Sequence, residues 1–270
     1  MENSFYETIT SRNLGLIDEE EQEKIRKSKV AICGLGGIGS PLSEMLLRLG
    51  VGNFNILDHG TFEPTNSNRQ IYSYTDTDGL RKTDVTEQYF KKVNPDVMVK
   101  KFTKLTDENV EEFIKDANMV ILAVDAMSPI LLLSRAARKN SVPLIEGWAL
   151  AFGNVRIFTD NTPTLEEVYN FPTVGRDVSD ISEEEQQTLL YSSIFQVAES
   201  FGGIMRHYPE RAVKKMQEKK VGTTLAPLVW LSSTMMAIEA MKIILGRGEL
   251  ALAPKFRVYD PFTFTSQLSK

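Results

Sequence analysis

The sequence has very few of the residue types that form cross-links or hold structural metals. Among its 270 residues there is one cysteine, Cys33, and there are two histidines, His59 and His207. A single cysteine excludes an intrachain disulfide and a C-x-x-C pair, and two histidines add too few ligands to favour a structural zinc site. We therefore expect a fold without zinc that relies on its hydrophobic core.

The sequence also lacks a membrane signal and an excess of positive charge. No uninterrupted apolar run approaches the roughly 20 residues that a membrane-spanning helix needs. The polar, acidic start, residues 1–10, does not resemble a secretory signal. The net charge of −5 argues against a nucleic-acid partner. These absences predict a cytoplasmic protein that binds neither a membrane nor a nucleic acid.

What the sequence does contain is a glycine-rich turn between an apolar run and a helical pattern. The apolar run, 30–33, leads into G-L-G-G-I-G, and the helical pattern then extends to Leu49. The turn contains four glycines: Gly34, Gly36, Gly37 and Gly39. Glycine lets backbone N–H groups approach a phosphate closely, and the N-terminus of the following helix favours negative charge. The alternative is a tight turn that only packs a helix on a strand.

An acidic residue completes the pattern of a βαβ nucleotide-binding unit. Asp58 follows a second short strand, expected over 54–57, and lies 19 residues after Gly39. At this place an acidic side chain commonly accepts hydrogen bonds from ribose hydroxyls. Cys33 lies on the first apolar run, so we expect a small core residue rather than a nucleophile.

Other polar residues stand at positions where they could serve a nucleotide. Asn66 and Arg69 lie in a long polar loop, 59–79, and Lys82 lies on a helix expected over 80–93. Asp125 follows the fully apolar run 119–124. Each has a structural alternative: the two cations could be solvated, Asn66 could form a turn, and Asp125 could cap the next helix.

Strand and helix patterns alternate through the first half of the chain. The expected strands cover 97–102, 119–124, 142–146 and 153–158, and the expected helices 18–27, 80–93, 108–114 and 128–139. This alternation predicts an α/β fold with a doubly wound, Rossmann-like sheet. Such a sheet brings Gly34, Asp58 and Asp125 to one carboxyl edge, where ligands bind.

We expect one domain made of four parts. An N-terminal arm and helix, 1–29, precede the nucleotide-binding core, 30–158. A helical insertion, 159–222, breaks the pattern with helices over 183–199 and 209–219. The last part, 223–270, begins within a turn at 222–227. That turn leads into an apolar helix over 228–245, of the kind that forms dimer interfaces, and a strand over 256–259 follows.

Taken together, these motifs resemble the ThiF/MoeB/HesA family of adenylyltransferases, whose fold is shared with ubiquitin-activating enzymes. The resemblance covers nearly the whole chain. It rests on the glycine turn, Asp58, the sequence N-x-N-R-Q at 66–70, Lys82, Asp125, I-E-G at 145–147, Gly153 and the turn at 222–227.

The resemblance implies that ATP activates a carboxylate as an acyl-adenylate and releases pyrophosphate. It implies that Asn66, Arg69 and Lys82 contact the phosphates, that Asp58 and the four glycines complete the nucleotide site, and that Asp125 holds Mg²⁺. Arg12 resembles an arginine that the family supplies across a dimer interface. The implied catalytic residues are thus Arg12, Arg69, Lys82 and Asp125. The implied partner is a small ubiquitin-like protein or a peptide with a C-terminal carboxylate, and the implied assembly is a homodimer.

The sequence departs from the family pattern in ways that keep other functions open. There are no zinc-binding C-x-x-C pairs and no cysteine after Cys33, so transfer through an enzyme cysteine is disfavoured. Ala126 follows Asp125 where Asn is common. One alternative is a catalytically silent relative that acts as a scaffold. A second is an NAD-dependent dehydrogenase, which fits the glycine turn and Asp58 but leaves Arg69 and Lys82 without a triphosphate to bind.

Overall fold

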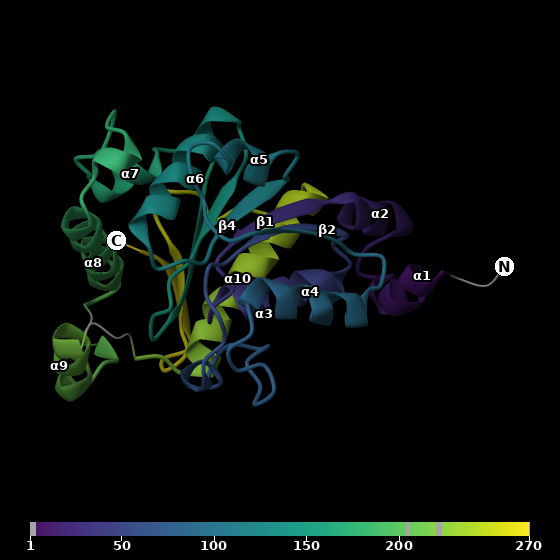
Figure 1. Ribbon diagram of the computed structural model, residues 1–270, viewed down its shortest axis with the longest axis horizontal. Coiled ribbons are helices and arrows are strands. Elements are labelled where there is room, and N and C mark those ends of the chain that lie inside the picture. Colours follow the sequence, from purple (N-terminus) through teal and green to yellow (C-terminus); the bar gives the residue numbers. More distant parts are fainter. Residues whose placement is uncertain (1–3, 204–205, 220–222, 270) are drawn as a thin grey trace.

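A computed structural model describes residues 4–203, 206–219 and 223–269, and it confirms the doubly wound α/β sheet (Figure 1). The strand order is β3-β2-β1-β4-β5-β6-β7-β8. The strands are β1 Lys29–Cys33, β2 Asn53–Leu57, β3 Met98–Phe102, β4 Met119–Leu122, β5 Leu144–Glu146, β6 Gly153–Phe158, β7 Arg257–Asp260 and β8 Thr265–Leu268. Strands β1 to β5 run parallel, whereas β6, β7 and β8 pair antiparallel. Because the order reverses between β1 and β4, the sheet has a switch point beside the glycine turn.

The central strands form because their residues are apolar on both sides. In β1 and β4 all residues except Lys29 are buried, as expected for parallel strands that helices cover on both faces. The buried hydrophobic residues form two cores. One lies against α5 and α6, around residues such as Phe113 and Leu131. The other lies against α3 and α10, around residues such as Leu42 and Met236.

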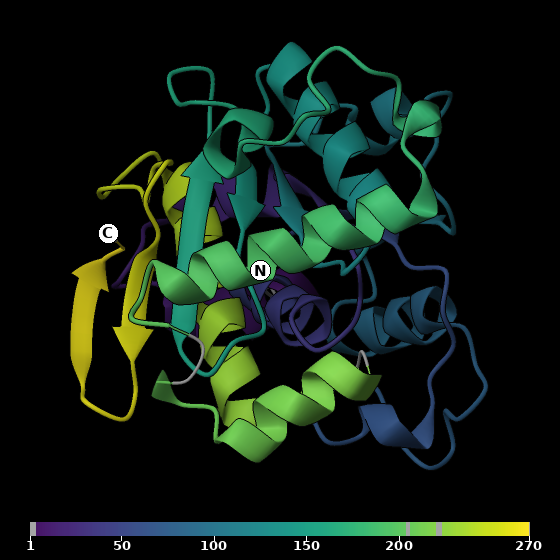
Figure 2. The same ribbon diagram turned by 90° about the vertical axis from the view of Figure 1, so that its left-hand side faces the viewer.

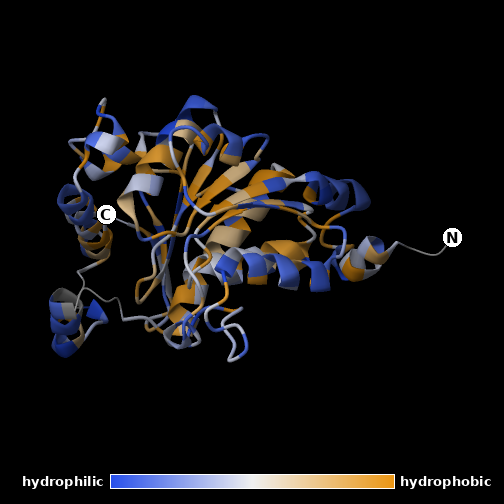
Figure 3. Ribbon diagram, viewed as in Figure 1, coloured by the Kyte–Doolittle hydropathy of each residue, from blue (hydrophilic) through white to orange (hydrophobic). Residues whose placement is uncertain are grey.

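The helices form layers on the two faces of the sheet (Figure 1). They are α1 Phe5–Thr10, α2 Glu19–Lys27, α3 Gly39–Leu49, α4 Lys82–Val93, α5 Val110–Ile114, α6 Met127–Lys139, α7 Leu165–Tyr169, α8 Glu183–Glu199, α9 Glu210–Lys219 and α10 Ala226–Leu245. Figure 3 shows hydrophobic residues on the sheet and on α10, and polar residues on the outer surfaces of α2, α4, α8 and α9. This distribution matches amphipathic helices that cover a buried sheet.

The N-terminal arm is more ordered than the sequence suggests. Helix α2 begins as expected, because the Asp18 side chain accepts a hydrogen bond from Glu21 N and the Glu21 side chain accepts one from Asp18 N. Helix α1 is not predicted from the sequence. Its capping box joins Ser4 to Glu7, and Tyr6 Oη donates to Gly50 O at 2.8 Å. The arm therefore packs on the C-terminal end of α3.

The insertion contains both predicted long helices and one that was missed. Figure 2 faces the side that α8 and α9 cover, with the β7–β8 hairpin at one edge. The unpredicted α7 has only 5 residues and is set by a capping box between Thr164 and Glu167. In the expected turn at 222–227, Gly222 lies outside the described residues, and α10 already begins at Ala226.

Helix α10 is the one described helix long and apolar enough, by length and composition alone, to cross a membrane. It nevertheless carries Glu239 and Lys242, which form an ion pair with each other. Its packing is internal: a Cβ placed on Gly153 of β6 would lie 2.6 Å from Leu231 Cγ and 2.7 Å from Met235 Sδ. Close contact with β6 makes α10 a core helix of this fold.

Two further boundaries differ from the sequence prediction. The final strand extends to Asp260, and a second strand, β8, follows it; its residues are all exposed, so no apolar alternation marks it. The loop 59–79 is less irregular than expected. It contains a 3-10 turn, Pro64–Asn66, and two buried aromatic anchors, Phe62 and Tyr72.

Candidate active site

The glycine turn joins β1 to α3, and its four glycines do two different things. Gly34 has φ +98°, and a Cβ there would lie 2.3 Å from Ala123 O at the end of β4. A Cβ on Gly39 would lie 1.8 Å from Gly34 O. These two glycines therefore serve close packing. Gly36 and Gly37 are half-buried, so they form the more accessible side of the turn. A Cβ on Gly36 would come no closer than 3.9 Å to Gln70 Nε2, whereas one on Gly37 would lie 3.2 Å from side-chain atoms of Arg69 and Val229.

The backbone of this turn presents free donors. Leu35 N donates to Asp58 Oδ2 at 2.8 Å, but the N–H groups of Gly36, Gly37 and Ile38 have no hydrogen-bond partner among residues 4–203, 206–219 and 223–269. They precede the N-terminus of α3. Adjacent unpaired N–H groups at a helix N-terminus form an anion site, and a phosphate satisfies them.

Asp58 and Lys82 lie on either side of Gly60. Asp58 Oδ1 accepts from Gly60 N at 2.8 Å, and Lys82 N donates to Gly60 O at 3.1 Å. A Cβ on Gly60 would lie 3.6 Å from Lys82 Nζ and 3.2 Å from Asp58 Oδ1. Within the described part of the chain, the Lys82 ammonium has no ion-pair partner. The site thus holds a half-buried cation beside the carboxylate that follows β2.

Arg69 covers the open side of the glycine turn. Its Cγ and Cδ would lie 3.2 Å from a Cβ on Gly37. Its Nη1 donates to Thr65 O at 3.0 Å and to Asn68 Oδ1 at 2.6 Å. No carboxylate within the described ranges pairs with this guanidinium. Its positive charge is therefore available to an anion bound at the turn.

Asn66 shapes the loop in this structure. Its carbonyl accepts from Arg69 N at 3.0 Å and from Gln70 N at 2.9 Å, and its Oδ1 accepts from Glu63 N at 3.3 Å. These contacts favour the turn-forming alternative for Asn66, although its position beside Arg69 keeps it near the site. Gln70 was not singled out as a separate site residue. It is buried, its Oε1 has no partner, and its Nε2 would lie 3.9 Å from a Cβ on Gly36.

Asp125 lies just past β4, two residues after the Ala123 that packs on Gly34. It is exposed, and it does not cap α6, whose N-cap is Ala126 without a side-chain bond. The structural alternative of a helix cap is therefore wrong. A single free carboxylate fits Mg²⁺, which typically combines one or two carboxylates with water and substrate phosphates. No cluster of three or more His, Cys, Asp or Glu residues occurs in the described ranges.

Arg12 is not brought to the site within one chain. It lies in a 3-10 turn, Ser11–Asn13, and the neighbouring Asn13 donates from Nδ2 to Leu49 O at 3.0 Å. Leu49 is the last residue of α3, whereas the glycine turn lies at its start. With a rise of about 1.5 Å per residue, the two ends of this helix are roughly 16 Å apart. Arg12 is exposed at the far end.

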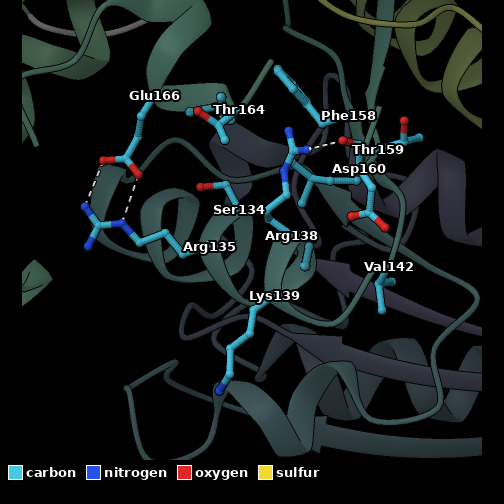
Figure 4. A pocket seen from close by; sticks show the side chains of 13 residues that line it. Ser134, Arg135, Arg138, Lys139, Val142, Phe158, Thr159, Asp160, Thr164 and Glu166 are labelled. Carbon is cyan, nitrogen blue, oxygen red and sulfur yellow. Dashed lines mark hydrogen bonds and ion pairs between the residues drawn. The ribbon is translucent and has the colours of Figure 1, made fainter. Parts of the chain in front are cut away.

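Two other polar clusters, one between α6 and α7 and one in the sheet, pair their charges internally, although the buried Arg156 Nη2 has no partner in the described ranges. A cavity of about 240 Å³ lies between α6, β5, β6 and α7 (Figure 4). On its wall, Arg135 pairs with Glu166 through two bonds of 2.8 and 2.9 Å. Deeper in the fold, Arg156 Nε donates to Glu146 Oε2 at 2.6 Å. Neither of these ion pairs includes a residue of the glycine turn.

Cys33 is fully buried, and burial, followed by the charge of Asp58, raises the pKa of its thiol well above its usual range. A buried thiol that stays protonated is a poor nucleophile. The prediction that Cys33 is a core residue is confirmed.

With this geometry established, comparison with known proteins identifies the family. The model of the ThiF family matches residues 10–270. The chain belongs to the ThiF family. This membership confirms the resemblance drawn from the glycine turn, Asp58 and Asn66 to Gln70.

Several ThiF-family relatives are similar along part or most of the chain. The molybdopterin-synthase adenylyltransferase of Haemophilus influenzae is 32% identical over 156 residues, which make up 56% of this chain and 64% of that protein. The sulfur carrier protein adenylyltransferase of Thermus thermophilus is 27% identical over 246 residues, 90% of this chain and 79% of that protein. The chain spans between about half and two thirds of the length of several curated relatives that it matches.

Solved structures share the fold. Escherichia coli MccB with ATP superposes with a TM-score of 0.66 at 18% identity, covering 93% of this chain and 65% of that one. The Escherichia coli tRNA N6-threonylcarbamoyladenosine dehydratase TcdA with AMP gives 0.65 at 20% identity, covering 90% and 97%. At these identities the likeness concerns the fold alone.

Proposed function

We propose that this protein is an ATP-dependent adenylyltransferase that converts a carboxylate into an acyl-adenylate. The observation that carries the proposal is the gathering of Arg69, Lys82 and Asp58 around a turn in which the N–H groups of Gly36, Gly37 and Ile38 have no partner among the described residues. The relatives named as adenylyltransferases support it. A dehydrogenase fits less well, because hydride transfer gives the two unpaired cations no role.

The proposed reaction needs no general base. A carboxylate is already ionised near pH 7, so its oxygen attacks the α-phosphorus, a new O–P bond forms, and pyrophosphate leaves with the electrons of the broken P–O bond. Charge builds on the phosphate oxygens. Lys82, Arg69 and the turn N–H groups lie where they stabilise it, and Asp58 holds the ribose.

A magnesium ion belongs to the proposal. Asp125 would hold it, and its charge would neutralise part of the triphosphate. The chain's own contribution is the exposed Asp125 carboxylate. It follows β4 at the carboxyl edge of the sheet and does not cap α6. Zinc has no part in the proposal.

The proposed substrate is the C-terminal carboxylate of a ubiquitin-like protein or of a ribosomal peptide. Relatives include the sulfur carrier protein ThiS adenylyltransferase and ubiquitin-like modifier-activating enzyme 5, and MccB has been solved with N-formylated MccA. Because Cys33 is buried and protonated, the acyl group passes to a nucleophile that another molecule, or the substrate itself, provides. The enzyme is proposed to work in the cytoplasm, where ATP is supplied.

The proposal includes a homodimer in which Arg12 reaches the site of the other subunit. Its support is the position of Arg12, at the end of α3 away from the glycine turn of its own chain. Exposed apolar side chains on the outer face of α10, such as Ile238, and on the arm, such as Leu16, provide surface for a subunit contact.

ATP–pyrophosphate exchange tests the proposed function. Wild type is assayed with and without a panel of peptides and ubiquitin-like proteins, beside Asp125→Ala. Asp96→Ala is the matched control, because this exposed carboxylate follows α4 at the opposite edge of the sheet. We expect exchange that depends on one substrate, is lost in Asp125→Ala and persists in Asp96→Ala. If the wild-type protein does not bind ATP at all, the result would favour the scaffold alternative.

A further inference from the structure

Helix α10 begins beside both loops that face the proposed triphosphate. Trp230 Nε1 donates to Arg69 O at 2.8 Å. Ser233 Oγ donates to Ile38 O at 3.0 Å. A Cβ on Gly37 would lie 3.2 Å from Val229 Cγ1. The first two turns of one helix thus contact the Arg69 loop and the glycine turn together.

The two hydrogen bonds differ in their surroundings. Ser233 is fully buried, so water cannot replace its bond to the Ile38 carbonyl. Its hydroxyl also lies 3.2 Å from Val229 O, but one proton serves one of these acceptors at a time. Trp230 is 39% exposed, so a smaller aromatic ring fits there without a cavity.

A second link ties the same loop to the segment before α10. The Arg69 guanidinium donates to Asn68 Oδ1, and Asn68 Nδ2 donates to Thr224 O at 3.3 Å. Arg69 is therefore attached to this part of the chain through its main chain and, by way of Asn68, through its side chain. The adenosine side of the site is held differently, because Asp58 bonds Leu35 N and Gly60 N and has no bond to α10.

We propose that Trp230 and Ser233 are positioning residues for the phosphates of ATP. They hold the Arg69 main chain and the glycine turn at the separation that a bound triphosphate requires. This inference rests on the proposed function, because it takes ATP as the ligand. Neither residue touches a reacting atom. Their removal weakens the binding of a nucleotide with phosphates and leaves adenosine binding unchanged.

The test compares two ligands on matched variants. Calorimetry gives the Kd of Mg-ATP and of adenosine for wild type, Trp230→Phe and Ser233→Ala. The controls are Trp148→Phe and Ser232→Ala. Ser232 is the buried neighbour of Ser233, but its hydroxyl bonds Trp148 O and not the glycine turn. Trp148 Nε1 donates to Glu146 and Tyr169, away from the phosphate loops.

We expect each positioning variant to raise the Kd of ATP by about 3- to 10-fold, the usual effect of one lost hydrogen bond. The Kd of adenosine should stay within about twofold. Ser233→Thr, which keeps the hydroxyl, should restore ATP binding, and the controls should match wild type for both ligands. In Trp148→Phe, Trp230 is the one remaining tryptophan, so ATP should shift its emission and adenosine should not.

The outcomes separate the two proposals. If wild type binds ATP and the ratio of the two Kd values is the same in all variants, the positioning role is wrong while the proposed function stands. A parallel loss of ATP and adenosine binding would show a purely structural role and would also overturn it. Wild type that binds no ATP would overturn the proposed function and the inference that rests on it.

Discussion

Two groups of charged residues in this protein are built in opposite ways. At the glycine turn, Lys82 and Arg69 have no carboxylate partner in the described ranges, and Asp125 is exposed. Inside the sheet, the side chains of Glu146 and Arg156 are each 3% exposed and lie 2.6 Å apart.

The buried pair has nearly every bonding position filled. Glu146 Oε1 accepts from Tyr169 Oη at 2.8 Å and from Trp148 Nε1 at 3.1 Å, and Arg156 Nη1 donates to Pro254 O at 3.0 Å. A charge that is saturated by its own chain contributes to the fold, whereas one left unsaturated at the carboxyl edge of a sheet is available to a ligand. The contrast teaches that pairing distinguishes the two roles better than charge alone.

The largest expected effect is on stability at the buried pair. Glu146→Gln should lower the free energy of unfolding by about 3–5 kcal/mol, because it leaves the Arg156 charge buried without compensation. Chemical denaturation measures this loss. Replacing both residues by Met should recover most of it, since Trp148 Nε1 can still donate to Tyr169 Oη at 3.0 Å. A loss below about 1 kcal/mol in Glu146→Gln would contradict the structural role.

For Lys82 we expect the reverse: a large effect on activity and a small effect on stability. Lys82→Ala should slow pyrophosphate exchange by about 10²- to 10³-fold, as removal of one stabilising donor does. Its free energy of unfolding should change by less than about 0.5 kcal/mol, because the ammonium has no ion pair to lose in the described structure and lies 6.0 Å from the centroid of the Phe62 ring. Lys255→Ala is the control for both assays, because this exposed lysine precedes β7 at the opposite edge of the parallel sheet. Equal exchange rates in the two variants would remove Lys82 from the proposed site.

Arg12 sharpens the comparison, because it is an exposed cation that lies away from the glycine turn of its own chain. Arg12→Ala and Arg69→Ala should each be inactive alone. After the two are mixed and exchanged, about one quarter of wild-type activity should return, since half of the dimers are mixed and each holds one intact site. Exchange activity of the mixture measures this recovery. If the mixture is as inactive as each variant alone, Arg12 does not act across a dimer.

The smallest effect belongs to the pair formed by buried Glu166 and the partly exposed Arg135. Burial raises the pKa of Glu166, but hydrogen bonds from Arg135 and Thr173 outweigh burial and leave this pKa below its usual value. The stability that the ionised carboxylate contributes is therefore present above its unfolded-state pKa of about 4.3 and is lost as pH falls through the folded-state pKa.

The corresponding variant is Glu166→Gln. It should be less stable than wild type by about 1 kcal/mol at pH 7, and the difference should shrink below about pH 4, where wild type also loses the charge. Unfolding curves recorded from pH 7 to pH 3 measure it. Glu184→Gln, an exposed residue at the start of α8, should show no such dependence. A difference that is constant with pH would mean that ionisation of Glu166 does not stabilise the fold.

The sequence predicts those elements whose signal is local and strong. The strand that contains Ile32 and the one that contains Ile121 are recognisable because both of their faces are buried and therefore apolar. Strand β8 is missed because all its residues are exposed and carry no alternation. Helices α1 and α7 are missed because each is short and stabilised by a capping box and by contacts, such as Tyr6 to Gly50, that lie far apart in the sequence.

The same distinction applies to the candidate site. Gly34 and Asp58 follow from spacing along the chain and Lys82 from the family resemblance, and the structure brings the three together. Trp230 could not be predicted, because it bonds to a carbonyl 161 residues earlier, and a tryptophan in an apolar helix normally indicates only packing. Asn66 is the opposite case. Its motif predicted a phosphate contact, but its side chain and its carbonyl accept hydrogen bonds within the turn.

The most direct test of the central claim is equilibrium binding of Mg-ATP and of NAD to wild type and Lys82→Ala. The account predicts that wild type binds ATP and not NAD, and that Lys82→Ala weakens ATP binding by at least about tenfold, because an unpaired cation beside a phosphate contributes more than a neutral donor. Tighter binding of NAD than of ATP, or ATP binding that is unchanged in Lys82→Ala, would contradict the claim that these unpaired charges form an ATP site.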